Sequence, residues 1–493
     1  MNSKYILIFL SVYIMCICSS CSDFLKEVSQ DEFEPKTASA FQELLNGEGY
    51  STTICLDPIT DVLTDDVEGA QGQSDNYIDE NLAHRAVYTW QSNMYLLLAD
   101  YDMTNLLHTY QKLYKCIMAC NLVIDGLTDA DGTEDEKMQT RGEALALRAY
   151  YYFLLVNLYA MPYNCAGTAP ESLLGVPLVI KPEIRDEGIA RNTVAEVYTQ
   201  ICKDIEEACS LLDGKADNTL GLFRINNVAA HLLASRIYLY MENWDKVLEH
   251  ANVALADAPA LVDLTTYQLS NPAFPHYAIN NIISRNFPEV IFINGSMSGS
   301  IKTEGTLIRV SESGSNALLR LYDSSDARRN IFFSDMSPLY YKYWMAKRGT
   351  QEQGFVWRTA ELYLNRAEAY AAKYMAGDNS CGQKAVDDLD ALRSKRLSNF
   401  VAYTLTTPAA LMEFCHEERR RELCFESHRW FDLRRYGMPS IEHTWYDASG
   451  NRTVYTLKEK DLGYVLPIPQ DAMDTNSALI QNELAPERVG EVN

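Results

Sequence analysis

The sequence predicts a mainly α-helical protein. It combines a scaffold of tetratricopeptide-like helical pairs with an irregular, loop-rich lobe that contains short strands. Apolar residues recur with the period of a helix over long stretches, mainly within residues 104–260 and 355–437. The expected helical stretches are residues 104–127, 134–160, 193–213, 226–257, 358–375, 382–397 and 408–436. Between residues 261 and 350, short apolar runs are broken by Pro, Gly, Asn and Ser, which favours loops and short strands. A polar, glycine-containing stretch adds residues 55–100 to this lobe.

The helical pair is clearest in "LLASRIYLYMENWDKVLEHANVALADAPA". From Trp244, small and apolar residues follow at steps of 3, 4, 3 and 5 to Pro259. These spacings are typical of the tetratricopeptide repeat, in which small side chains let two antiparallel helices approach closely. A looser copy spans residues 360–396, and residues 141–160 with 193–212 form a third pair across a long insertion. Three such units fit a solenoid core, with unrelated helical hairpins as the alternative.

The N-terminus has the features of an exported protein. Lys4 is the only charge before "YILIFLSVYIMCIC", an apolar run of 14 residues. That run is shorter than the roughly 20 residues that a membrane-spanning helix needs. A basic start, a short apolar core and small residues after it are typical of a secretory signal peptide, here residues 1–20.

The signal peptide ends in Ser-Ser-Cys, which resembles the lipobox of bacterial lipoproteins. In that interpretation Cys21 becomes the first mature residue and carries acyl chains such as palmitate, and residues 21–40 form a polar tether. Each buried acyl carbon contributes ~0.8 kcal/mol, and stable anchoring needs more than one chain. Ordinary signal cleavage, with Cys21 as one more small apolar residue, is the alternative.

The charge of the chain excludes several classes of partner. The formal net charge is −24, and it becomes −25 when the leader and its single positive charge, Lys4, are removed. Binding to nucleic acid needs an excess of Lys and Arg over the phosphates, which this chain lacks. The same negative charge opposes electrostatic adhesion to anionic lipid. A neutral ligand remains compatible with the composition.

Cysteine and histidine spacing predicts neither a metal site nor a disulfide framework. Three of the 12 cysteines lie in the leader region, and the other nine are an odd number with no Cys-x-x-Cys. Cys116 and Cys120 share a helical face, where a metal pair is conceivable, but no histidine partners them. The eight histidines show no ligand spacing. We expect the cysteines to be small buried side chains, and we expect no cofactor.

The segment "EERRRELCFESHRWFDLRRYG", residues 417–437, is the most highly charged stretch. Thr407 can cap its helix and Pro408 can start it. Glu418 and Glu422 could form a catalytic acid/base pair. Interleaved arginines would however hold these carboxylates ionised and make them poor general acids. We therefore favour a structural role, in which paired charges let a largely buried helix carry no lone ion.

The sequence gives little support for an enzyme. It contains no His-Glu-x-x-His, no Gly-x-Ser-x-Gly, no Walker loop and no Gly-x-Gly-x-x-Gly. A glycoside hydrolase that uses two carboxylates from distant segments remains the unlikely alternative. We predict a non-catalytic binding protein.

Tyrosine excess points to a neutral glycan as ligand. The chain has 31 Tyr against 16 Phe and six Trp, and tyrosine suits surfaces that are apolar on one side and wet on the other. The loop "TDDVEGAQGQSDNYIDENLAHRAVYTW" is polar and contains glycine. Its candidate ligand-binding residues are Asp66, Asn76, Tyr77 and Trp90, of which Trp90 could also simply be packed.

Four motifs together resemble one family. They are the leader ending in "CSDFL", "RTAELYLNRAEAYA", the charged segment 417–437 and the closing "YVLPIPQDAMDTNSALIQN", residues 464–482. This combination is similar to the SusD-like (RagB/SusD) nutrient-binding outer-membrane lipoproteins of Bacteroidota. The resemblance spans essentially the whole mature chain.

The resemblance implies a single domain over residues 21–493, with four tetratricopeptide-like units as scaffold and the ligand site in the less regular lobe. Members of the family sit on the cell surface as lids over a partner SusC-like TonB-dependent transporter. They capture oligosaccharides, or peptides in some branches, and are not enzymes. The acidic "SDFLKEVSQDE" is similar to the signals that send such lipoproteins to the outer leaflet.

The family's ligand residues transfer poorly onto this sequence. The resemblance places glycan sites in the loop matching residues 63–90 and on aromatics in the stretch matching 290–318. Here that second stretch offers only Phe292, which we expect in a strand. The nearest other aromatic side chains are Phe274, His276, Tyr277 and Phe287, of which Tyr277 is our candidate. A paired aromatic platform is therefore not predicted, and a peptide or a charged glycan stays open as the ligand.

Overall fold

The computed structural model describes residues 35–50, 57–70, 84–100, 108–165, 167–183, 187–214, 221–295, 308–334, 344–345, 347, 354–447 and 449–492. Its contacts divide the chain into two units, Met1–Lys36 and Thr37–Asn493. The signal peptide, Cys21 and most of the expected tether lie outside the described residues. Within the described residues, every helix is too short or too polar to cross a membrane.

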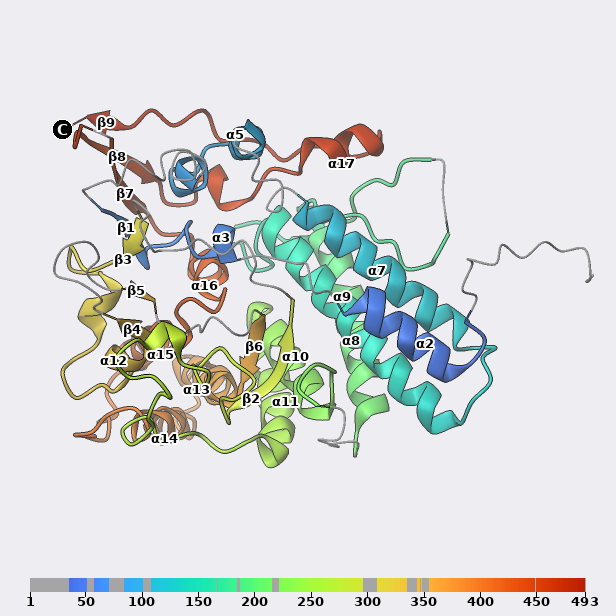
Figure 1. Cartoon of the computed structure of the whole chain (residues 1–493), viewed down its shortest axis with the longest axis horizontal. Helices are drawn as coiled ribbons and strands as arrows, with labels where there is room; N and C mark the ends of the chain where they lie inside the picture. Colours follow the sequence, from blue (N-terminus) through green and yellow to red (C-terminus); the bar gives the residue numbers. More distant parts are fainter. Residues whose placement is uncertain are drawn as a thin grey trace, which may run out of the picture. The chain divides into compact units, whose positions relative to one another are not determined.

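The long helices between residues 109 and 257 lie close to their predicted bounds. They are α7 (Thr109–Gly126), α8 (Glu134–Tyr159), α9 (Val194–Leu212), α10 (Asn227–Tyr240) and α11 (Trp244–Asp257). Figure 1 shows α7, α8 and α9 side by side, and α10 and α11 contact each other along their length. The shorter α2 (Ala38–Leu44) begins within the expected tether and packs on α7 and α8.

Local sequence explains where these helices begin. Thr133 and Glu136 form a complete capping box at the start of α8, and Thr193 and Glu196 form another at the start of α9. Each box satisfies two backbone N–H groups that the first turn of a helix leaves unpaired. Asn226 caps α10 through its side chain. These contacts join residues only three apart, so the helix starts follow from sequence alone.

Small residues allow the paired helices to pack closely. Ala251 and Ala254 of α11 are fully buried, as the repeat spacing predicts. Gly142 of α8 faces α9 so closely that a Cβ there would lie 2.8 Å from Cγ of Leu212. The pairs α8/α9, α10/α11 and α13 (Thr359–Met375)/α14 (Gly382–Arg393) confirm the predicted helical-pair scaffold.

The charged segment forms two helices where the sequence predicts one over 408–436. Helix α15 spans Pro408–Leu423, and α16 spans Arg429–Arg435. Phe425 and Ser427 between them have φ of +57° and +61°. A left-handed backbone at an L-residue cannot continue a right-handed helix, so the chain turns there.

Short antiparallel strand pairs build the loop-rich lobe and confirm the strand predicted around Phe292. Strand β1 (Val67–Gly69) pairs with β3 (Ile308–Val310), and β2 (Val290–Asn294) pairs with β6 (Phe355–Arg358). Strand β4 (Phe333–Ser334) pairs with β5 (Trp344–Met345). The β1–β3 pair brings the predicted ligand loop beside the later half of the lobe.

The C-terminal sheet was not predicted. Strands β7 (Ile441–Tyr446), β8 (Arg452–Leu457) and β9 (Glu491–Val492) form it in the order β7-β8-β9. Strand β7 alternates buried and more exposed side chains over its six residues, so this alternation was an available signal in the sequence. The other short elements are α3 (Asp57–Thr60), α5 (Met94–Asp100), α12 (Arg328–Phe332) and α17 (Gln470–Thr475).

The cysteines in the described part of the chain are not joined in disulfides. Six of them are buried, including Cys116 and Cys120 on the inner face of α7. The tyrosines at helical spacing, such as Tyr151 and Tyr152, are also buried in the core.

Candidate functional site

The exposed aromatic side chains of the described residues are few. Phe223, Phe274 and Tyr277 are exposed, whereas Phe287 and Phe292 are buried. Phe274 and Tyr277 are 50% and 57% exposed and flank the short 3-10 turn η5 (Pro275–Tyr277). Their ring centroids lie 6.4 Å apart at an interplanar angle of 59°. The structure therefore presents two adjacent aromatic rings to solvent in the lobe where the sequence predicts the ligand.

Side-chain hydrogen bonds to the backbone hold this loop in one shape. Asn281 is fully buried, and its amide donates to the carbonyl oxygen of Pro275 at 2.8 Å. Asn280 accepts from the backbone N–H of Ser270 at 2.7 Å, and the Ser270 hydroxyl accepts from Ile279 at 2.9 Å. Amide and hydroxyl side chains thus replace the regular backbone ladder that a loop lacks. The aromatic pair is consequently presented on an ordered support.

A positive charge lies on the same surface lobe. The guanidinium of Arg285 stands over the exposed ring of Phe223, 5.0 Å from its centroid. The backbone next to Phe223 is tied to β2, because Leu222 accepts from the N–H of Ile293 at 2.7 Å. An arginine over an aromatic face is a surface that can bind both an apolar ring and an anionic group.

Asp66, a predicted ligand residue, is buried in an ion pair. Its carboxylate accepts from Nε of Arg420 at 2.7 Å, and only 1% of the residue is exposed. Burial raises the pKa of Asp66, outweighing the opposing effect of Arg420. The neighbouring Asp65 is paired with Arg420 and Arg429. Burial alone would raise the pKa of Asp65, but these two guanidiniums lower it below its usual value. In this structure Asp66 offers no surface to a ligand.

Trp90 is also buried, and its polar atom is satisfied within the protein. Its indole N–H donates to the carbonyl oxygen of Leu63 at 3.0 Å. Its ring stacks on His443 of β7, with centroids 4.2 Å apart, and Tyr88 stacks on the same imidazole at 4.1 Å. Trp90 is therefore packed in the interior, which is the alternative that the sequence left open for it. Asn76 and Tyr77 lie outside the described residues.

Glu418 and Glu422 do not form an acid/base pair. Glu422 is fully buried and accepts from three guanidiniums, those of Arg328, Arg358 and Arg396. Burial raises the pKa of Glu422, but the three guanidiniums outweigh it and hold that pKa well below its usual value. A carboxylate kept ionised in this way cannot donate a proton near neutral pH. The structural interpretation of the charged segment is confirmed for these residues.

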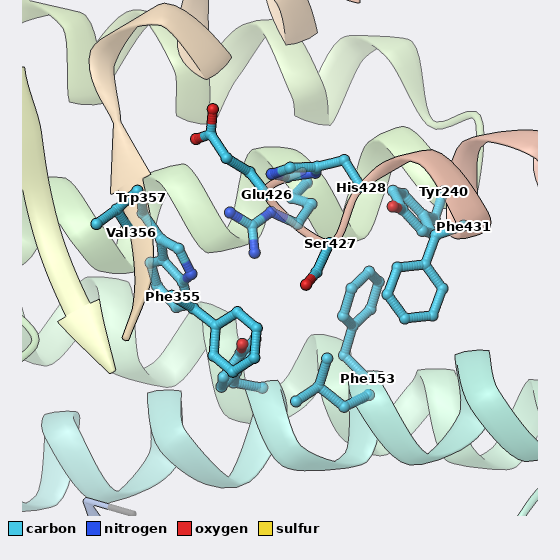
Figure 2. Close-up of a pocket in the computed structure, with 12 residues that line it drawn as sticks. Phe153, Tyr240, Phe355, Val356, Trp357, Glu426, Ser427, His428 and Phe431 are labelled. Carbon is cyan, nitrogen blue, oxygen red and sulfur yellow. The ribbon is translucent and has the colours of Figure 1, made fainter. Parts of the chain in front are cut away.

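A small cavity beside this ion network is too tight for a ligand. It encloses about 20 Å³ between α8, α10, β6 and the turn before α16. Figure 2 shows Ser427 directed into the space between Phe355 and Phe153. The Ser427 hydroxyl is buried and has no hydrogen-bond partner among the described residues. A volume of this size holds about one water molecule, which would satisfy that hydroxyl.

A second hollow lies between α7, the segment 177–189 and α17. It measures about 200 Å³ and is lined largely by apolar atoms of Tyr110, Tyr114, Val179, Ile189 and Leu479. Pockets for small ligands usually measure about 300–1,000 Å³. Neither of these two hollows of the described residues has the size or the polar lining that an oligosaccharide needs. The exposed aromatic loop is a candidate site on its own geometry, because two adjacent rings face solvent there.

The sequence names Tyr277 as a candidate and Phe274 only as a nearby aromatic, and it does not predict that the two rings lie side by side. The available signal was the three-residue spacing of two aromatics around a proline in an Asn- and Ser-rich loop. That spacing does not reveal exposure, which depends on how residues 264–287 fold back on themselves.

Family models match most of the chain. Residues 23–239 match a family described as starch-binding and associating with the outer membrane, and residues 296–484 match one described as the SusD family. A SusD-like protein of Formosa agariphila is 20% identical, over 96% of this chain and 97% of the relative.

Solved structures show the same fold. A putative sugar binding protein from Bacteroides vulgatus is 23% identical with a TM-score of 0.69, covering 92% of this chain and 99% of that one. A SusD superfamily protein from Bacteroides thetaiotaomicron is 22% identical with a TM-score of 0.66, covering 90% and 98%. These chains share the fold over 92% and 90% of this chain, respectively.

Proposed function

Because the chain belongs to the SusD/RagB family, we propose that it is a cell-surface lipoprotein that binds an oligosaccharide. It delivers this ligand to a partner SusC-like TonB-dependent transporter, over which it acts as a lid. The similarity of a starch-binding family and of a putative sugar binding protein supports a carbohydrate ligand. Lipid on Cys21 anchors the chain to the outer membrane, with the folded domain outside the cell.

The ligand binds on the loop that carries Phe274 and Tyr277. The observation that carries this proposal is the exposure of the two neighbouring rings on a loop held by side-chain hydrogen bonds, of which the one from Asn281 to Pro275 is buried. Sugar rings have apolar C–H faces and hydroxyl edges, and an aromatic ring with a polar tip complements both. A pre-ordered loop binds with less loss of conformational entropy than a flexible one.

The protein binds its ligand without catalysing a reaction on it. The strongest candidate acid/base pair, Glu418 and Glu422, is buried and held ionised by arginines. A bound glycan is therefore released unchanged to the transporter. Incubation of the protein with a bound glycan, followed by chromatography, tests this point, and shorter sugars among the products would contradict it.

Isothermal titration calorimetry against a panel of oligosaccharides tests the ligand site. For a glycan that binds the wild type, Tyr277→Ala and Phe274→Ala should each weaken affinity by about 10-fold, equivalent to 1.4 kcal/mol. Met375→Ala is the matched control, since it removes a similarly exposed apolar side chain from helix α13, outside the loop-rich lobe. Affinity unchanged by the first two variants would move the site away from this loop.

A charged glycan is the second candidate, favoured by Arg285 over the ring of Phe223. If it is the ligand, Arg285→Gln should weaken binding, and added salt should weaken it further because exposed charges are screened. Uniformly absent heat with glycans, together with heat for peptides, would instead favour a peptide ligand.

A further inference from the structure

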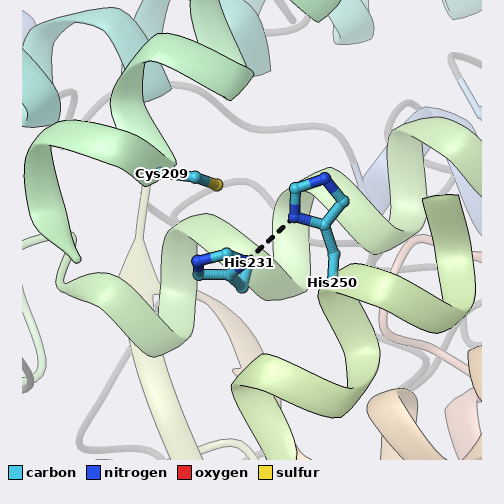
Figure 3. Close-up of side chains that lie close together, drawn as sticks. All are labelled: Cys209, His231 and His250. Carbon is cyan, nitrogen blue, oxygen red and sulfur yellow. Dashed lines mark hydrogen bonds between the residues drawn. The ribbon is translucent and has the colours of Figure 1, made fainter. Parts of the chain in front are cut away.

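We propose that Cys209, His231 and His250 bind a transition-metal ion, for which zinc(II) is the best match. The three residues come from three consecutive helices: Cys209 from α9, His231 from α10 and His250 from α11. Their candidate ligand atoms all lie within 4.8 Å of one another, and all three residues are buried. Figure 3 shows the two imidazoles facing each other with the thiol beside them.

The donor set is typical of zinc. Zinc takes thiolate sulfur at about 2.3 Å and imidazole nitrogen at about 2.0–2.1 Å, usually in a tetrahedron. Nitrogen atoms in such a tetrahedron are about 3.3 Å apart. Here Nδ1 of His231 and Nδ1 of His250 are 2.9 Å apart. The imidazoles therefore need to separate by only a few tenths of an ångström, while the thiol rotates inward. A water molecule can supply the fourth ligand.

A carboxylate already orients one of the imidazoles. Nε2 of His250 lies 3.3 Å from Oε1 of Glu206 on α9. When His250 donates from Nε2 to this carboxylate, its Nδ1 carries a lone pair and faces His231 and Cys209. Metal-binding histidines characteristically donate their second ring N–H to a carboxylate in this way. Glu206 is held in turn by the Tyr238 hydroxyl at 2.6 Å and by Lys246 at 3.1 Å.

The chemistry of the three side chains suits a cation. A zinc ion would replace the thiol proton of Cys209, because a coordinating cysteine binds as the thiolate. It would also replace the hydrogen bond between Nδ1 of His231 and Nδ1 of His250, which are 2.9 Å apart, with two metal–nitrogen bonds.

The neighbouring acidic set is a weaker candidate. Glu206 and Glu249 also lie within 4.8 Å of a nitrogen of His250. Lys246 already occupies that space, with its ammonium 3.1 Å from Glu206 and 3.0 Å from Glu249. A cation between Glu206 and Glu249 would have to displace the ammonium of Lys246. A cation between Cys209, His231 and His250 would displace only the hydrogen bond between the two imidazoles and the thiol proton of Cys209. The Cys209 side is therefore the binding side.

Substitution of cobalt(II) for zinc tests the proposal on the full chain. Cobalt in a tetrahedral site with a thiolate ligand gives a sulfur-to-metal charge-transfer absorption and intense visible bands. The wild type stripped with chelator should bind one equivalent with both signatures. Cys209→Ser should abolish the charge-transfer band, whereas Cys202→Ser, on the same helix but outside the set, should retain it. Glu206→Gln should weaken zinc binding by about 10- to 100-fold, as expected for loss of a partner that orients a ligand.

X-ray absorption spectroscopy of the zinc-loaded wild type identifies the atoms bound to the metal without any substitution. The test therefore does not depend on whether a variant folds. The proposal requires one sulfur and two imidazole nitrogens around the zinc. A shell without sulfur, binding that survives Cys209→Ser unchanged, or no binding at all would each overturn the proposal. In those cases the three side chains are a packed core contact closed by the hydrogen bond between His231 and His250.

Discussion

The guanidinium of Arg420 donates to the carboxylate of Asp66 at 2.7 Å and thereby ties the loop-rich lobe to helix α15 of the scaffold. Arg420 also donates to the backbone carbonyl oxygens of Asp65 and Asn316, at 3.0 and 2.9 Å. One buried side chain thus joins both halves of the lobe to the helices. Asp66 therefore supports the lobe on which the proposed ligand site is built.

Asp66→Asn should lower stability while leaving ligand affinity unchanged. The variant removes the anion from a buried charged hydrogen bond, and Asp65 still partly neutralises Arg420. The expected loss in free energy of unfolding is about 1–3 kcal/mol. Urea denaturation measures it, with calorimetry at a temperature where the variant is folded. A marked loss of affinity in the fully folded variant would return Asp66 to the ligand site.

Glu422→Gln should lower the free energy of unfolding more than Asp66→Asn does, because the carboxylate of Glu422 pairs with three guanidiniums in a buried network. Removing one partner from a buried ion cluster costs about 3–5 kcal/mol, since the remaining charges are left uncompensated. Glu417→Gln is the matched control on the same helix. Its side chain is 47% exposed and pairs only with Arg421, so its loss should cost less than about 0.5 kcal/mol. Equal effects of the two variants on the urea midpoint would refute the importance of the network.

Stability should fall as the pH drops from about 6.5 towards 4.5. Burial lowers the pKa of His443 to about 4 and holds the pKa of His428 well below its usual value. Below the ordinary histidine pKa of about 6.5, the unfolded chain binds protons that the folded chain excludes, so acid favours unfolding. His443 alone should contribute roughly 2–3 kcal/mol to this loss.

His443→Asn provides the comparison for that titration. Its free energy of unfolding should start lower at pH 7, because the stack with Trp90 and Tyr88 is lost. It should then decline less steeply than the wild type between pH 6.5 and 4.5. Parallel curves for the two proteins would show that folding does not lower the pKa of His443.

Cys21→Ser should release the protein from membranes and abolish its labelling with palmitate, because the thiol is the proposed site of acylation. Cell fractionation and metabolic labelling measure the two effects. Cys18→Ser is the control, since it changes a nearby thiol but leaves the proposed acylation site intact. A Cys21→Ser protein that still fractionates with membranes would disprove the lipid anchor.

The sequence alone was sufficient to predict those features whose contacts join residues close together in the chain. Glu418 lies three residues before Arg421, a spacing that ion pairs use on a helix, and their ion pair is present at 3.0 Å. Arg328, which pairs with both Glu418 and Glu422, comes from a segment 90 residues away from Glu418 and left no pattern in the sequence. The same limit applies to Trp90, whose burial depends on a histidine of the unpredicted C-terminal sheet.

The candidate sites depend still more on tertiary contacts. Phe274 and Phe287 are equally aromatic and lie in one loop, yet the first is half exposed and the second is buried. Cys209, His231 and His250 follow no ligand spacing, because each belongs to a different helix. Their proximity comes from the packing of α9, α10 and α11.

The amino-acid sequence determined most of the long helices and their capped starts, because hydrogen bonds and side-chain contacts within a helix join residues only three or four positions apart. Only the tertiary structure decided which aromatic rings face solvent, which carboxylates are neutralised and which thiol meets two imidazoles. Those outcomes depend on burial and on distances between segments far apart in the chain, and no local pattern encodes them.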